Sequence, residues 1–282
     1  MTQTVIENPG SPAPKALSVI LPTFDRQELT DRAIDSLCAR APGRIEIIVV
    51  DDAGPTPYKA PAASNRCGID IRVIRLASNG GPSVARAHGV RHAAANHVAF
   101  LDSDDLCAEG WMDYCLERIA AGLEGGMPRF ITMGMVSGGN VFNGMIHRRL
   151  SRLPARLQRS VTRALIPIVN LFYTPAIAMH RDLFKATPQL RHGEDYYSIM
   201  HAIFRADAVL ITAREACTLG RTPGSVGGLS ANAKAMFRGE WMARRLAVRH
   251  GFIPRPYVPL SWLGCAYQLV RALRRKLRGA GA

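Results

Sequence analysis

Long apolar runs are missing from this sequence of 282 residues. The most apolar window, residues 164–179, is shorter than the roughly 20 residues that a helix needs to cross a bilayer, and Pro167 and Pro175 interrupt it. A signal peptide is not apparent, because the first residues are polar and rich in proline. We therefore expect a chain that does not span a membrane, with residues 1–16 as a flexible lead.

Paired cysteine motifs are also missing. The six cysteines are scattered and contain no CxxC: Cys38, Cys67, Cys107, Cys115, Cys217 and Cys265. A chain of this length buries enough apolar surface to be stable without disulfides. We therefore expect reduced thiols and a cytoplasmic protein.

Acidic residues are scarce in one half of the chain only. Residues 1–145 carry 13 Lys or Arg and 16 Asp or Glu, whereas residues 146–282 carry 23 and 6. The second half therefore favours an anionic partner such as nucleic acid, an anionic membrane or a phosphorylated substrate. Aromatic residues do not alternate with the basic ones and no nucleic-acid-binding motif is present, so we expect no nucleic-acid partner.

Two segments concentrate this positive charge, Arg148–Arg163 and Leu269–Arg278. Both interleave Leu and Val with Arg, so a helix formed by either has an apolar stripe beside a cationic face. Such a helix suits the surface of an anionic membrane, at the inner face of which we expect the protein to lie. The alternative is that each stripe packs on the protein's own core while the arginines are solvated.

Strands and helices alternate in the first half of the chain. Continuous or alternating apolar segments predict strands, and 3.6-residue periodicity predicts helices. The expected strands are Leu17–Leu21, Ile45–Val50, Ile69–Leu76 and His97–Leu101, and the expected helices are 27–40 and 82–95. This order predicts an α/β fold with a mostly parallel sheet flanked by helices. The carboxyl ends of its strands then share one edge, where ligands bind.

The second half has a different pattern. Arg129–Val136 and Val141–His147 flank the turn residues Ser137–Asn140, which predicts a hairpin. We further expect strands at Ala176–His180 and Ala208–Thr212, a helix at Glu194–Arg205, and two basic helical segments at the end. The expected division is 17–230 as one domain, with halves 17–125 and 126–230, followed by a basic helical extension over 231–282.

Acidic residues cluster directly after the last strand of the first half. Asp102, Asp104 and Asp105 repel one another unless a cation or hydrogen-bond donors neutralise them, and carboxylate oxygens suit Mg²⁺ or Mn²⁺. The alternative is an acidic loop that caps the next helix. The residue types leave both interpretations open.

Other candidates are weaker when taken singly. Asp52 follows the second strand, where an acidic side chain often binds ribose or base, but Asp before Gly-Pro is also ordinary turn chemistry. Arg86, one helical turn beyond a Gly-Gly turn, could reach a phosphate or base, and is equally explained as a solvated helix residue. Glu194 and Asp195 suit either a general base or the acidic first turn of a helix.

Taken together, these motifs resemble the family 2 glycosyltransferases of the GT-A fold. The matching segments, in order, are VILPTFDR (Val19–Arg26), EIIVVDDAG (Glu46–Gly54), NGGPSVARAHG (Asn79–Gly89), FLDSDD (Phe100–Asp105), GED (Gly193–Asp195) and, more weakly, RTPGSVGGLS (Arg221–Ser230). They span about residues 17–230. Each motif alone has low specificity, whereas the ordered set is specific.

The resemblance implies a role for each matched residue. Pro22 and Thr23 would line the nucleotide pocket, Asp52 would bind the base, and Arg86 would organise the acidic loop. Asp104 would bind Mg²⁺ or Mn²⁺, with Asp102 on ribose or metal and Asp105 as the neighbouring ligand. Asp195 would deprotonate the acceptor hydroxyl, supported by Glu194, and Arg221 would hold the leaving diphosphate. The implied activity is inverting transfer of one sugar from a nucleotide diphosphate, with UDP as the expected nucleotide.

The sequence departs from the family pattern in places. DDAG replaces the usual DDGS, and no QxxRW follows GED, which argues for single-sugar transfer rather than processive polymerisation. The expected acceptor is a lipid-linked or polysaccharide-precursor saccharide. Two alternatives remain, a sugar nucleotidyltransferase, which lacks support from a phosphate loop after the first strand, and a non-catalytic membrane- or polyanion-binding protein.

Overall fold

The computed structural model describes residues 5–6, 15–38, 44–60, 69–139, 141–221 and 232–267. Within them, nine strands form one sheet in the order β1-β4-β3-β2-β5-β8-β7-β9-β6. Their bounds are β1 Val5–Ile6, β2 Leu17–Thr23, β3 Ile45–Asp51, β4 Asp70–Arg75, β5 His97–Phe100, β6 Leu106–Cys107, β7 Phe130–Ser137, β8 Ile177–His180 and β9 Ala208–Thr218.

The first half of the sheet is parallel, as predicted. β2 pairs in parallel with β3 and β5, and β3 pairs in parallel with β4. The sheet as a whole is mixed, because β8 runs antiparallel to both β5 and β7 while β9 runs parallel to β7. The fold is therefore α/β as expected, and the antiparallel β8 joins its two halves.

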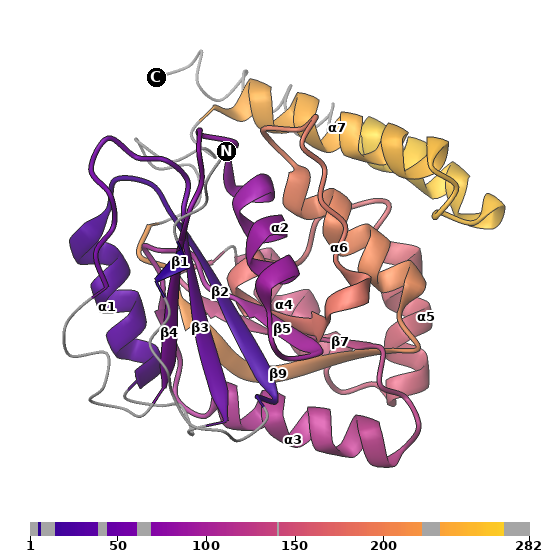
Figure 1. Cartoon of the computed structure of the whole chain (residues 1–282). Helices are drawn as coiled ribbons and strands as arrows, with labels where there is room; N and C mark the ends of the chain where they lie inside the picture. The colour runs from indigo at the N-terminus through magenta and orange to yellow at the C-terminus, as the bar shows by residue number, and fades with distance from the viewer. Residues whose placement is uncertain are drawn as a thin grey trace.

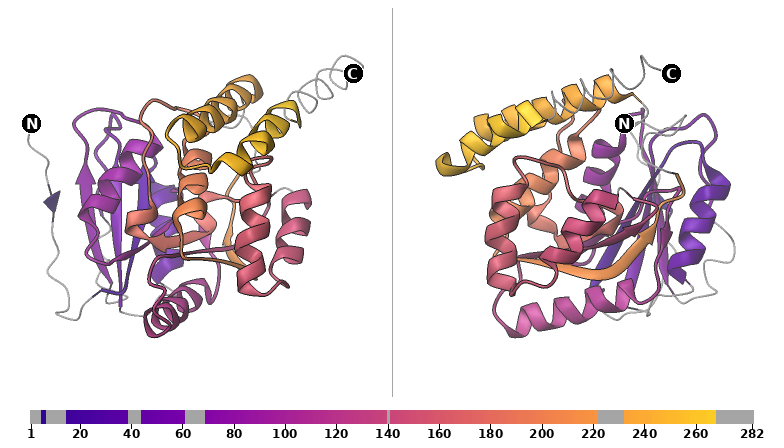
Figure 2. Two further views of the ribbon diagram at one scale, coloured as in Figure 1. Left: turned by 90° about the vertical axis from the view of Figure 1, so that its right-hand side faces the viewer. Right: turned by 180° about the vertical axis from the view of Figure 1, so that it is seen from behind.

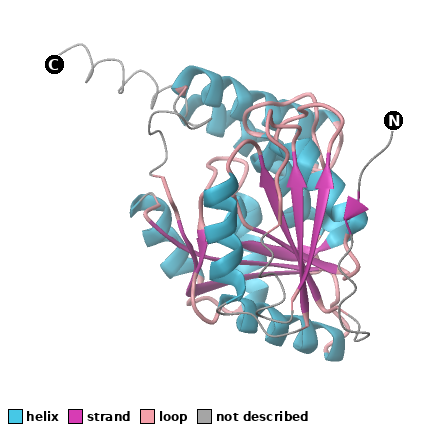
Figure 3. Ribbon diagram, turned by 60° about the vertical axis from the view of Figure 1, so that its left-hand side comes forward, coloured by secondary structure: helices cyan, strands magenta, loops and turns pink. Residues whose placement is uncertain are grey.

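Helices cover both faces of the sheet (Figures 1 and 3). Their bounds are α1 Gln27–Cys38, α2 Pro82–His92, α3 Trp111–Glu124, α4 Val141–Leu150, α5 Ala155–Leu165, α6 Glu194–Arg205 and α7 Ala233–Arg249. One apolar cluster joins the sheet to α1 and α3, and a second joins the other face to α2, α4, α5, α6 and α7. The prediction of a sheet between two helical layers is confirmed.

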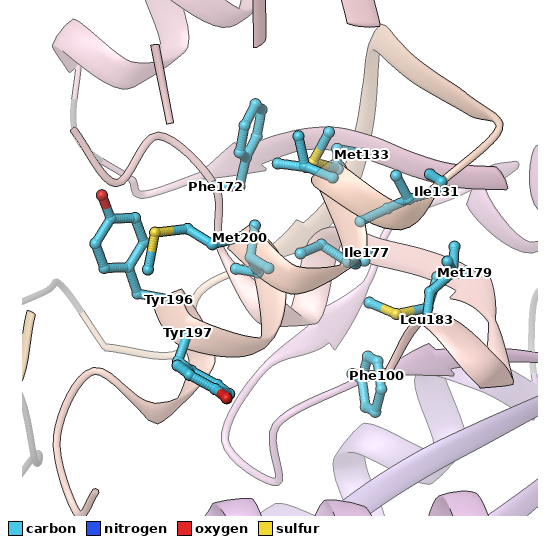
Figure 4. Packing of buried hydrophobic residues seen from close by; sticks show 14 of the residues in the cluster. Phe100, Ile131, Met133, Phe172, Ile177, Met179, Leu183, Tyr196, Tyr197 and Met200 are labelled. Carbon is cyan, nitrogen blue, oxygen red and sulfur yellow. The ribbon is translucent and has the colours of Figure 1, made fainter. Parts of the chain in front are cut away.

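Alternation along β2 divides its side chains between these two clusters. Ile20 lies in the cluster under α2 and α6, whereas Val19 and Leu21 lie in the one under α1. All three are fully buried, as expected of a central parallel strand. Figure 4 shows the α6 side, where Tyr196 and Met200 pack among side chains from β5, β7 and β8.

The predicted hairpin after residue 128 is wrong. β7 forms over Phe130–Ser137, but Val141–Leu150 is helix α4, and β7 pairs with β8 and β9 instead. A short alternating segment of apolar and polar residues fits a strand or one side of a helix. The strands that pair with β7 are far away in sequence, so the local pattern does not identify them.

The predicted continuous helix over Arg148–Arg163 is also wrong. α4 ends at Leu150 and α5 begins at Ala155, after Pro154. Proline lacks the N–H that a helix interior needs and disfavours helical backbone at the residue before it. Two of the arginines serve the fold: Arg163 donates to the backbone oxygens of Ile203, Phe204 and Ala206 at the end of α6, and Arg159 donates to that of Asp207.

Two further expectations, on the cysteines and on the N-terminal lead, differ from the structure. Cys38 forms a disulfide, so the expectation of six reduced thiols is wrong, whereas Cys107, Cys115, Cys217 and Cys265 are not in disulfides. Val5–Ile6, inside the expected lead, pair with β4. The segment Leu269–Arg278 lies outside the described residues.

The last described part of the chain packs on α6. α7 runs along the outside of the molecule, and residues 258–267 form a further helix beside it (Figure 2). On α7, Arg244 is only 1% exposed and donates to the backbone oxygens of Pro167 and Ile168. Among the described residues, no helix is long and apolar enough to cross a membrane.

Candidate active site

The carboxyl ends of β2 and β3 place the first two motifs side by side. Thr23 is opposite Asp51 in the parallel register, and the Asp52 N–H donates to the Thr23 carbonyl oxygen at 2.9 Å. Thr23 is buried, and its hydroxyl lies 2.7 Å from that of Thr30 on α1, while Pro22 is half-buried. Thr23 therefore fixes the turn after β2 against the neighbouring helix.

Asp52 holds the Gly-Gly turn that precedes α2. Its two carboxylate oxygens accept hydrogen bonds from the N–H groups of Gly80 and Gly81, each at 2.8 Å. Gly81 has φ +82°, a conformation that glycine adopts without strain. Burial raises the pKa of Asp52, and the two N–H groups oppose that rise. Asp52 therefore links the end of β3 to the start of the helix that carries Arg86.

Arginines neutralise the acidic loop after β5. Arg86 donates to Asp102 at 2.6 Å, and Asp104 pairs with Arg26 at 2.9 Å and with Arg221 at 3.4 Å. The side chains of Asp102 and Asp104 are 33% and 19% exposed, so ligands from solution can reach both. The interpretation of this loop as only a helix cap lacks support, since α3 has no side-chain cap.

Asp105 differs from its two neighbours. It is 5% exposed and accepts a hydrogen bond from the Gly220 N–H at 3.0 Å. Burial, together with the charges of Asp102 and Asp104, raises its pKa to about 7. A Cβ added at Gly220 would lie only 1.7 Å from the Asp104 carbonyl oxygen, so glycine is required for this close approach. Asp105 thus ties the loop to the segment that carries Arg221.

Arg86 also reaches the acidic start of α6. Its side chain is 7% exposed and lies 3.6 Å from a carboxylate oxygen of Glu194. Burial raises the pKa of Glu194 to about 7, and the neighbouring Asp195 adds to the rise. Burial also raises the pKa of Asp195, which Arg86 opposes. One buried guanidinium therefore connects the acidic loop to two carboxyl groups that accept protons more readily than ordinary acids.

A small pocket adjoins this cluster. Its polar lining comes from Ser83, Arg86, Thr174, Glu194, Asp195 and Ser198. The Nε atom of Arg86 and the hydroxyl of Thr174 are buried there without hydrogen-bond partners. The structure therefore brings Arg86, Glu194 and Asp195 to one pocket, whose remaining lining includes the apolar Phe100, Ile177, Met179, Phe184 and Ile199.

The donor set of the acidic loop fits a hard divalent cation. Asp102 and Asp104 offer accessible carboxylate oxygens, whereas Asp105 is occupied by the Gly220 N–H. No group of three or more potential metal ligands occurs among the residues that the structure describes. A cation held by two carboxylates takes its remaining ligands from substrate phosphates and water, which is the usual arrangement for Mg²⁺.

Three features of the site were not predicted. Arg26 contacts Asp104, and the sequence signal for it is its place as the last residue of the first motif. Gly220 is required by a contact with a loop far away in sequence. Asp25 and Ala53, in adjacent turns, have φ of 52° and 58°, a left-handed conformation that is uncommon for residues other than glycine.

Comparison with known proteins gives the chain a family context. The family model described as "Glycosyl transferase family 2" matches residues 18–187. A GalNAc(5)-diNAcBac-PP-undecaprenol beta-1,3-glucosyltransferase of Campylobacter jejuni is 32% identical over 38% of this chain and 35% of its own length. The uncharacterized glycosyltransferase EpsJ of Bacillus subtilis is 36% identical over 36% of this chain and 30% of its own. The chain thus matches about a third or less of these relatives.

Solved structures share the fold at low sequence identity. The mannosyltransferase PcManGT of Pyrobaculum calidifontis, in complex with GDP-Man and Mn²⁺, has a TM-score of 0.61 at 16% identity, covering 98% of this chain and 79% of its own. Residues 1–349 of TarS from Staphylococcus aureus, in complex with UDP-GlcNAc, have a TM-score of 0.58 at 18% identity. The match covers 81% of this chain and 65% of the TarS chain. This likeness confirms the predicted GT-A-like fold.

Proposed function

Because the chain belongs to glycosyl transferase family 2, we propose that it transfers a single sugar from a nucleotide diphosphate, UDP by preference, to a saccharide hydroxyl with inversion at the anomeric carbon. The observation that carries the proposal is the double contact of Arg86. It lies between Asp102, on the expected donor side, and Glu194 beside Asp195, on the expected acceptor side. These two contacts hold the expected donor side and the expected acceptor side next to each other.

The donor side consists of the three strand ends. Pro22, Thr23 and Asp52 border the nucleotide site, with Asp52 ordering the Gly-Gly turn through its hydrogen bonds. Asp102 binds ribose or shares the cation with Asp104. A divalent cation, Mg²⁺ or Mn²⁺, held there would stabilise the charge that develops on the leaving diphosphate. Arg221 and Arg26, which contact Asp104, exchange that carboxylate for the diphosphate oxygens.

The acceptor side supplies the base. Asp195 takes the proton of the acceptor hydroxyl, whose oxygen forms the new bond to the anomeric carbon as the bond to the diphosphate oxygen breaks. Burial raises the pKa of Asp195, which makes its carboxylate a better proton acceptor than an ordinary aspartate. Its Oδ1 accepts a hydrogen bond from the Tyr196 N–H at 2.7 Å, and the charge of Arg86, which Glu194 contacts, stabilises its ionised form. One base suffices because no covalent sugar intermediate forms.

The acceptor we propose is a lipid-linked or polysaccharide-precursor saccharide. One relative carries such an acceptor in its name, an undecaprenol-linked saccharide. A peripheral position at the cytoplasmic face of a membrane would give access to it. Of the arginines in Arg148–Arg163, the exposed ones are Arg148, Arg149, Arg152 and Arg156, and these are the candidates for contact with anionic lipid.

The test is nucleotide release from a panel of UDP-, GDP- and dTDP-sugars, with and without Mn²⁺ or Mg²⁺. We expect slow hydrolysis of one donor that requires metal and that falls at least about 100-fold in Asp195→Asn, the range of general-base catalysis. Asp182→Asn is the matched control, because its side chain is 71% exposed and pairs with His180 rather than with a residue of the site. Equal loss in both variants, or a donor turned over equally well by Asp195→Asn, contradicts the assignment of the base.

A further inference from the structure

The helix of residues 258–267 exposes its apolar side to solvent. Trp262, Leu263 and Tyr267 are 61%, 55% and 39% exposed, and Pro259 and Ala266 on the same side are exposed as well. Ser261 and Gly264 face the protein instead and are buried. A surface helix ordinarily buries its apolar side and exposes its polar one. We propose that this side, named here the Trp262 face, inserts into the interface of an anionic lipid bilayer.

The helix is fixed in this orientation by close packing behind it. A Cβ added at Gly264 would lie 2.4 Å from the Pro167 carbonyl oxygen and 2.9 Å from Arg244 Nε. Arg244 itself is buried, stacks on the Tyr196 ring at 4.7 Å and donates to the Pro167 carbonyl oxygen. Rotating the helix to bury Trp262 would put a larger side chain where only glycine fits. The packing at Gly264 therefore keeps the Trp262 face exposed.

The side chains of this face suit a bilayer interface. Trp and Tyr rings are amphipathic and concentrate where the lipid headgroups meet the acyl chains. A continuous exposed apolar patch on a soluble protein marks an interaction site. Leu263 between the two aromatic residues gives the patch its apolar centre.

The charge of this part of the chain favours anionic lipid. After Glu240 the chain has nine Lys or Arg and no Asp or Glu. Within the described residues, Arg245, Arg249 and Arg255 are exposed. A basic segment that also carries exposed aromatic residues is attracted to anionic headgroups, whereas it repels a second copy of itself. The occupant that matches both the chemistry and the charge is therefore an anionic membrane.

The Trp262 face is connected to the acceptor side of the site. α7 packs against the turn before α6, where a Cβ at Gly239 would lie 2.1 Å from the His192 carbonyl oxygen and one at Gly193 would lie 2.8 Å from Gly239. α7 also contacts the helix of residues 258–267 through Arg244. Docking by the Trp262 face would place the membrane on the α7 side, from which a lipid-linked acceptor approaches Asp195. This consequence rests on the proposed function, whereas membrane binding itself does not.

The test is co-sedimentation of the full chain with phosphatidylcholine vesicles and with vesicles that also contain phosphatidylglycerol. No donor sugar is present, so failure of the proposed enzyme activity leaves the result unaffected. We expect binding to the anionic vesicles only, and at least about tenfold weaker binding in W262S/L263S/Y267S. The matched control is L123S/M127S, which removes side chains of 60% and 49% exposure near α3, at the other end of the molecule (Figure 1).

A second measurement, of tryptophan fluorescence, leaves the residues of the Trp262 face in place. Trp262 is far more exposed than Trp111, which is 1% exposed, so in W241F its emission dominates any response to vesicles. We expect a blue shift and quenching by brominated lipid. Equal binding by the triple variant and its control, or no quenching, overturns the proposal. Light scattering that shows a dimer which the triple variant abolishes also overturns it, in favour of a second copy as the occupant.

Discussion

Arg86 donates a hydrogen bond from Nη2 to Asp102 Oδ1 at 2.6 Å, while its Nη1 lies 3.6 Å from Glu194 Oε1. The two carboxylates come from opposite halves of the chain, Asp102 after β5 and Glu194 at the start of α6. A buried guanidinium that pairs with both holds the halves in one geometry. Several properties of the protein depend on this contact.

Arg86→Ala removes the charge that compensates Glu194 and Asp102. Breaking a buried ion pair from one side typically costs about 3–5 kcal/mol, because the remaining charge stays buried. We expect a loss of stability near 3 kcal/mol in chemical denaturation, since Asp102 is partly exposed, and loss of donor turnover. Arg91→Ala, at an exposed position on the same helix, is the control and should be neutral. Equal stability of the two variants would show that Arg86 does not join the halves.

Glu194→Gln should change how stability depends on pH. The pKa of Glu194 is raised from its ordinary 4.5 to about 7 in the folded protein, so the folded state binds the proton more tightly than the unfolded state. Stability therefore decreases as the pH rises from about 4.5 to 7, by an amount on the order of 3 kcal/mol.

Glutamine lacks this titration. We expect the melting temperature of Glu194→Gln, relative to wild type, to increase between pH 5 and pH 8, measured by scanning calorimetry. Glu28→Gln, in the exposed first turn of α1, serves as the control and should show a constant difference. A constant difference for Glu194→Gln as well would mean that its pKa is ordinary.

Gly220→Ala should disturb the acidic loop without removing any charge. The new Cβ would lie 1.7 Å from the Asp104 carbonyl oxygen, so either the loop or the end of β9 must move. Overpacking of this kind typically costs about 1–3 kcal/mol. We expect metal-dependent nucleotide affinity, measured by calorimetry, to fall more than tenfold.

Gly144→Ala is the matched control for this substitution. Gly144 lies within α4, where an added Cβ has only the Met135 methyl within 4 Å, at 3.9 Å. Alanine is the better helix former, so this variant should be neutral or more stable by up to about 1 kcal/mol. Unchanged nucleotide affinity in both variants would remove Gly220 from the account of the site.

Arg163→Ala and Arg156→Ala should differ although both lie in one basic helix. Arg163 donates to the oxygens of Ile203, Phe204 and Ala206, which the end of α6 otherwise leaves unpaired. Arg156 is exposed. We expect a loss of roughly 2 kcal/mol in chemical denaturation for Arg163→Ala and almost none for Arg156→Ala. Similar small losses for both would restore the picture of a uniformly solvated helix.

The sequence predicts the elements whose patterns are local and the site residues that follow them. Parallel strands such as β2 and β3 are continuous apolar segments, and the acidic first turn and apolar periodicity of α6 set both its ends. Motifs at the ends of such strands meet because the sheet geometry requires it. Arg86 was placed beside the acidic loop only through the family resemblance, since its position in the sequence alone suited a phosphate contact and a solvated residue equally.

The remaining features depend on contacts between distant segments. α4 resembles a strand until β8 and β9 occupy the positions beside β7. Gly220 is necessary because the segment after β9 passes close to the acidic loop. The residues next to Gly220 in the sequence do not predict this contact. Trp262 is exposed because Gly264, on the opposite side of the helix, packs closely against the Pro167 carbonyl oxygen. The pattern of apolar residues in the sequence does not predict this contact.

The central claim is that the acidic loop binds a nucleotide diphosphate through a divalent cation. Calorimetric titration of UDP into the protein, with and without Mn²⁺, tests it most directly in wild type and in Asp104→Ala, with Asp182→Asn as control. The account predicts binding that requires Mn²⁺, is abolished in Asp104→Ala and is unchanged in Asp182→Asn. Absence of nucleotide binding in the wild type, with UDP, GDP and dTDP alike, would contradict it.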